Sequence, residues 1–319
     1  MLKSLSRKIA FQWIILCALL AYATYIIISQ AQPAGNEGVP FLFKHFANSF
    51  PKYELMGKGI ILTVLISQIL LLQYYYKKNN YSPKTSLMPA CFYLSILLLT
   101  KSLTVISPFF FTLLFFLIII SIDFTVGSEK LKSNVLWVGF LIAFATCFDI
   151  SSIVLFFLVL ATLIINQFSR IKEVGILLLG FLLLYLYFFS YYFFTNNLNE
   201  WVLTFQQLKF MGVLFSQLPH PNLTLISLIC LGIIYLFLIV KFKLLSDSKV
   251  ALQRNRIVTL NTRAILMIAC IFISNSTYPA VLGYLFVHIS IYLAMLAQEK
   301  SRLYINEWIT IIILVALCL

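Results

Sequence analysis

Long apolar runs follow one another along almost the whole chain, and they leave few folds open to it. A transmembrane helix needs about 20 mostly apolar residues to cross about 30 Å of hydrocarbon. The chain is 62% hydrophobic and 10% charged, whereas a water-soluble domain has about 25% charged residues. We therefore predict an all-α, polytopic transmembrane helix bundle of about eleven spans and exclude a soluble globular fold. The predicted spans cover residues 10–29, 59–76, 86–100, 107–122, 135–148, 150–167, 174–195, 222–240, 264–275, 280–297 and 303–319.

The distribution of positive charge predicts how these spans are oriented. Lys and Arg are retained in the cytoplasmic loops of membrane proteins. With a cytoplasmic N-terminus, 18 of the 23 Lys and Arg residues fall in inner segments and 5 in outer segments. The pattern therefore predicts an N-in, C-out topology. Orientation and contact with anionic lipid account for the formal charge of +13, so no nucleic-acid partner is expected.

The polar segments between the spans are short, which predicts a single integral membrane domain over residues 1–319. Two longer outer segments carry apolar residues at helical spacing with polar residues between them, which is typical of helices that lie in the membrane interface. Together they could cover a vestibule or only seal the outer surface. The apolar residues are Leu42, Phe43, Phe46 and Phe50 in the first segment and Trp201, Phe205, Leu208 and Phe215 in the second.

Several predicted spans are too short to cross a bilayer of ordinary thickness. The arms of the hairpins over 86–122 and 135–167 have about 14–16 residues and reach only about 21–24 Å. We expect their turns to lie below the outer surface, or the bilayer to be thinner there. The polar stretch 275–279, which ends in a proline, is a further candidate break in the helical pattern.

Common catalytic and cofactor-binding motifs are absent from the sequence. It contains no phosphate-binding glycine loop, no dinucleotide fingerprint, no zinc-protease motif and no nucleophile elbow. The six cysteines all fall in predicted spans without a paired spacing, and there are three histidines in total. We therefore expect neither a metal site nor a bound cofactor.

Two ionisable residues stand out because of their predicted depth in the membrane. His288 falls near the middle of the span 280–297, where ionisable groups are costly and often functional. It could bind substrate, or it could be a neutral imidazole that joins neighbouring helices. Asp149 lies in the tight outer turn of the second hairpin, where it could pair with Lys101 or act as a base that faces the vestibule.

A second group of candidates surrounds the first outer segment. Glu37 and Glu54 flank it, and several basic residues lie nearby. A carboxylate close to cations at the membrane surface suits general-base activation of a hydroxyl beside a lipid phosphate. A solvated charged loop is the simpler interpretation of the same pattern. The basic residues expected to bind substrate are Lys44, His45 and Lys52 in this first segment, Lys101 in the turn of the first hairpin and Lys209 in the second outer segment. Lys58 also lies in the first outer segment.

The order of these parts resembles the membrane module of GT-C-type glycosyltransferases: a span, an outer loop with a surface helix, short hairpins, a seventh span and a second outer loop. The resemblance covers about residues 1–221, with additional spans over 222–319. It implies a lipid-linked sugar or polyprenyl-phosphate substrate at the outer leaflet and an acidic residue in the first loop, here Glu37 or Glu54 where that family usually has Asp. The chain also resembles phenylalanine-rich, polytopic bacterial inner-membrane proteins that have no assigned activity.

Three functions remain compatible with the sequence. One is an enzyme of the GT-C type that acts on a lipid-phosphate donor. Another is a non-enzymatic membrane component of a cell-envelope assembly with a protein partner. The last is a small-solute transporter built around His288 and the interrupted region 264–297.

The predicted topology can be tested by cysteine labelling in a variant that lacks the native cysteines. A cysteine introduced at Ser248, in the basic segment 241–263, should react with an impermeant maleimide only from the cytoplasmic side. A cysteine at Asn48 should react only from the opposite side. Labelling of position 248 from outside the cell would overturn the whole map.

Overall fold

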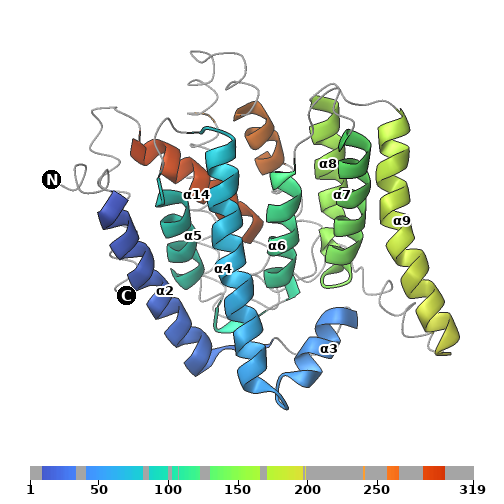
Figure 1. Ribbon diagram of the computed structural model, residues 1–319, viewed down its shortest axis with the longest axis horizontal. Coiled ribbons are helices and arrows are strands. Elements are labelled where there is room, and N and C mark those ends of the chain that lie inside the picture. Colours follow the sequence, from blue (N-terminus) through green and yellow to red (C-terminus); the bar gives the residue numbers. More distant parts are fainter. Residues whose placement is uncertain are drawn as a thin grey trace, which may run out of the picture.

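The computed structural model describes residues 9–33, 41–81, 86–99, 103–106, 108–122, 130–165, 171–196, 198, 240, 257–265 and 283–298. These residues are almost entirely helical, as predicted (Figure 1). Residues 257–265 are also helical. The other elements are α2 (Ile9–Gln30), β1 (Gln32–Pro33), α3 (Phe41–Ser49), α4 (Glu54–Lys78), α5 (Met88–Leu99), β2 (Val105–Ile106), α6 (Pro108–Ser121), α7 (Lys130–Thr146), the 3-10 helix η1 (Ile150–Ile153), α8 (Val154–Ile165), α9 (Ile171–Phe194) and α14 (Gly283–Gln298).

Three helices in the described part of the chain are long and apolar enough to cross a membrane. They cover Gln12–Gln30, Glu54–Lys78 and Lys172–Phe194, which correspond to the predicted spans 10–29, 59–76 and 174–195. The predicted span 303–319, nearly all of 222–240 and 264–275, the break at 275–279 and the second outer segment around Trp201 lie outside the described residues.

The short helices occupy the centre of the bundle rather than its edge. Every described side chain of α5 from Met88 to Leu98 is buried, and so is every one of α14 from Tyr284 to Met295. By contrast, α2 and α9 stand at the two sides in Figure 1 and expose most of their apolar surface. A helix that is apolar on all faces and enclosed by protein need not match the thickness of the hydrocarbon. This placement explains how α5 can have only 12 residues.

The chain around Arg263 differs from the prediction. The sequence pattern placed Arg263 in a basic inner loop that ends where the span 264–275 begins. In the structure, Arg263 lies within the helix of residues 257–265 and is only 7% exposed. Ile257, Leu260 and Ala264 are buried on the same helix, so its apolar face begins before the predicted span.

Side chains from neighbouring helices satisfy the backbone groups at several helix ends. Gln12 in α2 accepts a hydrogen bond from Leu87 N–H at 2.8 Å, just before α5 begins. Lys58 donates to Ile28 O near the end of α2 at 2.6 Å, and Lys78 donates to Ser121 O at the end of α6 at 2.6 Å. Each end of a helix leaves about four backbone groups without an intrahelical partner, and hydrocarbon offers them none. These contacts therefore join the ends of helices as well as their sides.

A short parallel strand pair fixes one end of the bundle. Gln32 and Pro33 of β1 pair with Val105 and Ile106 of β2, and Gln32 N–H donates to Thr104 O at 3.0 Å. The pair ties the end of α2 to the connection between α5 and α6. The sequence pattern does not predict this pair, because two residues are too few to show a strand pattern.

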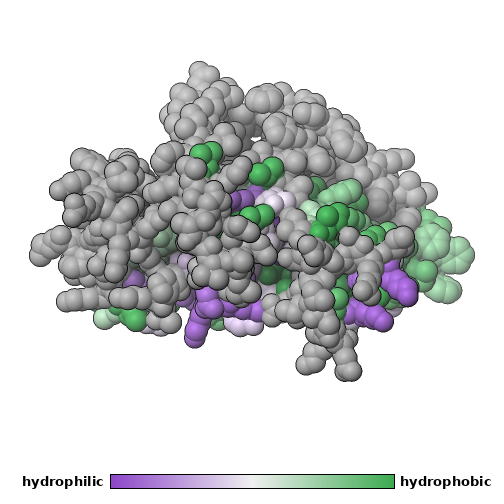
Figure 2. Space-filling view, turned by 90° about the horizontal axis from the view of Figure 1, so that it is seen from above, coloured by the Kyte–Doolittle hydropathy of each residue, from purple (hydrophilic) through white to green (hydrophobic). Residues whose placement is uncertain are grey.

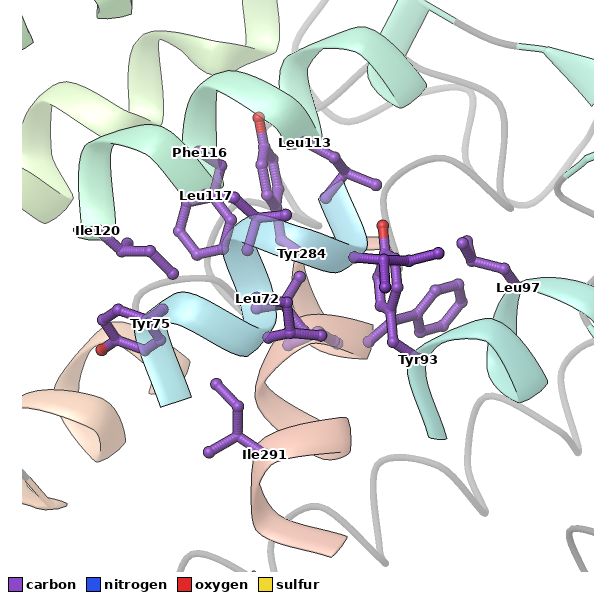
Figure 3. Close-up of a cluster of buried hydrophobic side chains, with 14 of the residues drawn as sticks. Leu72, Tyr75, Tyr93, Leu97, Leu113, Phe116, Leu117, Ile120, Tyr284 and Ile291 are labelled. Atoms are coloured by element: carbon purple, nitrogen blue, oxygen red, sulfur yellow. The ribbon is translucent and has the colours of Figure 1, made fainter. Parts of the chain in front are cut away.

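The core forms where α4, α5, α6 and α14 meet (Figure 3). The apolar side chains of this cluster include Leu72, Leu97, Leu117 and Ile291. One polar side chain in α4, the fully buried Gln68, donates to Phe110 O at 2.7 Å and accepts from the Tyr93 hydroxyl at 2.9 Å. A single amide thus joins three helices through two hydrogen bonds, as polar residues do inside membrane bundles.

Helices α7 and α9 approach each other at a pair of glycines. A Cβ atom at Gly180 would lie 2.3 Å from Leu136 O, and a Cβ at Gly139 would lie 2.3 Å from Leu177 O. The obstacle is backbone on both sides, so no side-chain rotation could relieve it. Small residues at a crossing are the usual device for close helix packing in membranes.

We predict that Gly180→Ala destabilises the protein by about 1–3 kcal/mol, since the added methyl group must push the two backbones apart. Gly175→Ala on the same helix is the matched control, because nothing lies within 4 Å of a Cβ there. It should be neutral or slightly stabilising. Thermal unfolding of both variants in the same detergent measures the difference. Equal melting temperatures would show that the crossing is looser than described.

Candidate functional site

Helix α3 has the amphipathic character predicted for the first outer segment. Phe43 and Ala47 are buried along one side, as is Phe50 just after the helix, while Lys44, His45, Asn48 and Ser49 are exposed on the other. The helix lies across one end of the bundle, at the bottom of Figure 1, which we call the α3 end. The structure thus confirms an amphipathic helix over these residues.

An aromatic cluster holds α3 against α6 and α7. The ring of Phe111 in α6 lies 5.0 Å from that of Phe46 and 5.3 Å from that of Phe148, measured between centroids. Phe43 and Phe115 extend the cluster on either side. Edge-on and offset aromatic pairs of this kind add to the free energy of burial. Leu42 N–H also donates to Cys147 O at 3.3 Å, so α3 is joined to the turn that follows α7.

Asp149 lies in that turn, between α7 and η1, as the sequence predicts. It is only 6% exposed. Its backbone N–H donates to Ala145 O at 3.0 Å, and its carbonyl accepts from Ser152 N–H at 3.0 Å. The α3 end therefore contains a buried carboxyl group close to the surface that α3 covers. The predicted partner of Asp149, Lys101, lies outside the described residues.

Glu54 is placed differently from Asp149. It is the first residue of α4, and its Oε1 atom forms an ion pair with Lys58 Nζ at 2.5 Å. The Glu54 side chain is 61% exposed. Lys52 lies with its ammonium 5.3 Å from the centroid of the Tyr53 ring. Glu54 is thus an exposed residue that pairs with Lys58. The other two candidates of this group, Glu37 and Lys209, lie outside the described residues.

Cations and large apolar side chains are exposed together at the α3 end. Lys44 and His45 project from α3, and Lys52 follows in the loop to α4. Tyr53, Leu55 and Met56 are exposed beside them, Leu55 by 89%. A surface that combines cationic and apolar groups can contact lipid headgroups and the upper part of their acyl chains at once.

Three buried polar residues follow one face of α14 at intervals of four: Tyr284, His288 and Tyr292. The Tyr284 hydroxyl donates to Thr112 Oγ1 at 3.2 Å and lies 3.3 Å from Ser152 Oγ, three residues after Asp149. His288 Nδ1 lies 3.0 Å from Tyr284 O; since a carbonyl only accepts, this nitrogen carries the hydrogen. The two deep residues singled out from the sequence are therefore linked through Ser152 and Tyr284.

His288 is also close to the aromatic core. It is 1% exposed, and its ring centroid lies 5.7 Å from that of Phe116. This buried, aromatic environment favours a neutral imidazole that joins neighbouring helices, which is one of the two interpretations left open by the sequence. The three polar residues of α14 extend over about 12 Å of an otherwise apolar helix.

A polar cluster at the opposite end of the bundle was missed by the sequence reasoning. We call it the Arg263 cluster. It consists of Arg263, Tyr75 in α4, Tyr81 just after α4, and Thr162 in α8. Arg263 Nη1 donates to the Tyr75 hydroxyl at 3.0 Å, and its Nε donates to Thr162 Oγ1 at 3.3 Å. The hydroxyls of Tyr75 and Tyr81 are 3.1 Å apart. Helical spacing of Ile257, Leu260 and Ala264 is the signal that could have placed Arg263 in a helix.

Tyr81 lies beyond the end of α4, and burial raises its pKa well above the usual value of 10.0. The nearby Tyr75 adds to this effect, while the charge of Arg263 opposes it. Tyr81 therefore stays a neutral hydroxyl at physiological pH. It can take part in hydrogen bonds but cannot supply negative charge to Arg263.

In the part of the chain that the structure describes, no three His, Cys, Asp or Glu residues gather in a way that could hold a metal ion. Comparison with known protein families, curated proteins and solved structures finds no match to this chain. The residues themselves therefore carry the functional argument.

We predict that Tyr284→Phe lowers the free energy of unfolding by about 1–3 kcal/mol. The change removes a hydroxyl that bonds Thr112 and leaves the buried Thr112 and Ser152 with one partner fewer. Tyr187→Phe is a suitable control, since Tyr187 is exposed on α9. Denaturant or thermal unfolding in one detergent compares the two. A Tyr284 variant as stable as the control would mean that these contacts contribute nothing to stability.

Proposed function

We propose that this chain is a multi-pass protein of the bacterial inner membrane that binds a phosphate-bearing lipid at its α3 end. In this proposal the α3 end faces the outer leaflet, and the ligand is a polyprenyl phosphate or a sugar linked to one. Enzymes of the GT-C type act on such lipids, and sugar transfer is the activity that we propose for the chain. The observation that carries the proposal is the exposed surface of cations and apolar groups at the α3 end, where α3 is hydrogen-bonded to the turn that contains Asp149.

The surface fits such a ligand in two respects. Lys44, His45 and Lys52 offer positive charge to a phosphate. Leu55 and Met56 offer exposed apolar area to the first isoprene units. The aromatic cluster beneath α3 holds the helix in place, so the cations are presented from a supported element rather than from a loose loop.

Among the three candidate carboxylates, Asp149 suits the role of a base best. Glu54 is held in an ion pair with Lys58 at the start of α4. Asp149 is buried in the turn to which α3 is hydrogen-bonded through Leu42. Glu37 remains a candidate from the sequence alone.

The binding step can be tested in nanodiscs of neutral phosphatidylcholine that contain a small fraction of polyprenyl phosphate. We expect the double variant Lys44→Gln/Lys52→Gln to retain the lipid about thirtyfold less than the wild type, because each of the two lysines near an anionic headgroup contributes about 1 kcal/mol. Native mass spectrometry of the eluted particles measures lipid retention. The matched control is Lys132→Gln/Lys172→Gln, which removes two exposed lysines from other helices.

Equal loss in both double variants would point to nonspecific charge attraction and would contradict a site at the α3 end. Unchanged retention in the Lys44/Lys52 variant would contradict it as well. For the catalytic step, Asp149→Asn should retain the lipid but transfer no sugar from a polyprenyl-phosphate-linked donor to a hydroxyl-bearing acceptor. Transfer at the wild-type rate would exclude Asp149 as the base that deprotonates the hydroxyl.

A further inference from the structure

The Arg263 cluster lies at the upper end of the bundle in Figure 1, far along the helices from α3. Tyr75 is one turn before Lys78, the last residue of α4, and Thr162 is in the last turn of α8. Figure 3 shows Tyr75 at the edge of the apolar core, near Ile120, with its hydroxyl oxygen directed away from the core. The cluster therefore lies between the apolar interior and the end of the helices.

The hydrogen bonds of the cluster leave more donors than acceptors. Thr162 already gives its hydroxyl hydrogen to Leu158 O at 2.8 Å, so it can only accept from Arg263. Tyr75 accepts from Arg263, and the contact between Tyr75 and Tyr81 uses one of the two tyrosine hydrogens. A guanidinium has five N–H donors, and the described residues accept two of them. Among the described residues, three N–H groups and one tyrosine O–H therefore have no acceptor and could donate to a ligand.

The charge of Arg263 also lacks compensation within the described chain. The ion pair between Lys58 and Glu54 is the only one found there, so no described carboxylate lies within 4.0 Å of Arg263. A buried cation that lacks an anion is costly, because protein and hydrocarbon solvate it poorly. Tyr81 stays neutral, as its environment requires, so it cannot take the part of the anion.

We propose that the Arg263 cluster binds the phosphate group of an anionic ligand, either the headgroup of a phospholipid or a phosphate-bearing solute. A phosphate offers several acceptor oxygens around one centre, which suits a guanidinium fork with a hydroxyl beside it. This site is separate from the α3 end and does not depend on the function proposed for that end.

The surroundings of the cluster favour an anion. Lys77 and Lys78 form the last turn of α4, and Lys78 is bonded to the end of α6. Figure 2 views this end of the molecule, and hydrophilic described residues stand at its surface beside apolar ones. Phospholipid headgroups meet a bundle where its helices end, which is the level of Arg263.

The proposal is tested with the full chain in nanodiscs of phosphatidylcholine alone. Inorganic phosphate or phosphatidylglycerol is the added probe, and thermal unfolding is followed by intrinsic fluorescence. A ligand that binds only the folded state raises the melting temperature. We expect one of the two probes to raise it in the wild type, and Arg263→Gln to abolish that rise. Lys172→Gln, which removes an exposed lysine, is the matched control and should keep the rise in full.

Arg263→Gln could fail to fold because it removes a buried donor, so Tyr81→Phe provides a second measurement. It keeps the ring and removes one hydroxyl, and we expect the apparent affinity for the effective probe to fall by about tenfold, the effect of one charge-assisted hydrogen bond. A rise with phosphate identifies a soluble ligand, and a rise with phosphatidylglycerol alone identifies a lipid headgroup. The absence of any rise in the wild type, or an equal rise in Arg263→Gln, overturns the proposal.

Discussion

Polar groups inside this bundle must find partners within the protein, and much of the structure follows from that constraint. Hydrocarbon offers no hydrogen bonds to the exposed ends of a helix. The side chains of Gln12, Lys58 and Lys78 therefore form hydrogen bonds from one helix to the end of another. The short strand pair joins the end of α2 to the connection between α5 and α6 in the same way. These contacts set the height of each helix relative to its neighbours, which apolar packing alone would leave free to slide.

The same constraint distinguishes the polar side chains in the core by whether the described residues satisfy their hydrogen bonds. Gln68 both donates to and accepts from neighbouring helices, so it serves as a structural link. The polar face of α14 is likewise bonded to neighbouring helices around Tyr284. Arg263 differs from these residues, because its charge and most of its donors are not matched by the described residues. A polar group that the fold does not satisfy is a better guide to a ligand than one that it does.

The two ends of the bundle have different chemistry. At the α3 end, exposed cations lie beside exposed apolar side chains, and the only described ion pair is at the surface. At the other end, the buried guanidinium of Arg263 donates to two described hydroxyl groups, those of Tyr75 and Thr162. An exposed cation attracts a headgroup through solvent and is weakened by salt. A buried one can bind fewer ligands but holds them through directed hydrogen bonds.

Apolar run length and helical spacing were enough to determine the all-helical class, the positions of α2, α4 and α9, and the amphipathic helix over Phe41–Ser49. They also placed Asp149 in a turn and His288 within a helix. They could not place Arg263, because a lone cation at the start of an apolar run looks the same in a loop as in a helix. Nor could they show that Glu54 pairs with Lys58, that Gly139 meets Gly180, or that α5 and α14 are enclosed by other helices. These facts depend on which helices are neighbours, and neighbours are chosen by side-chain shape and hydrogen-bond partners far apart in the chain.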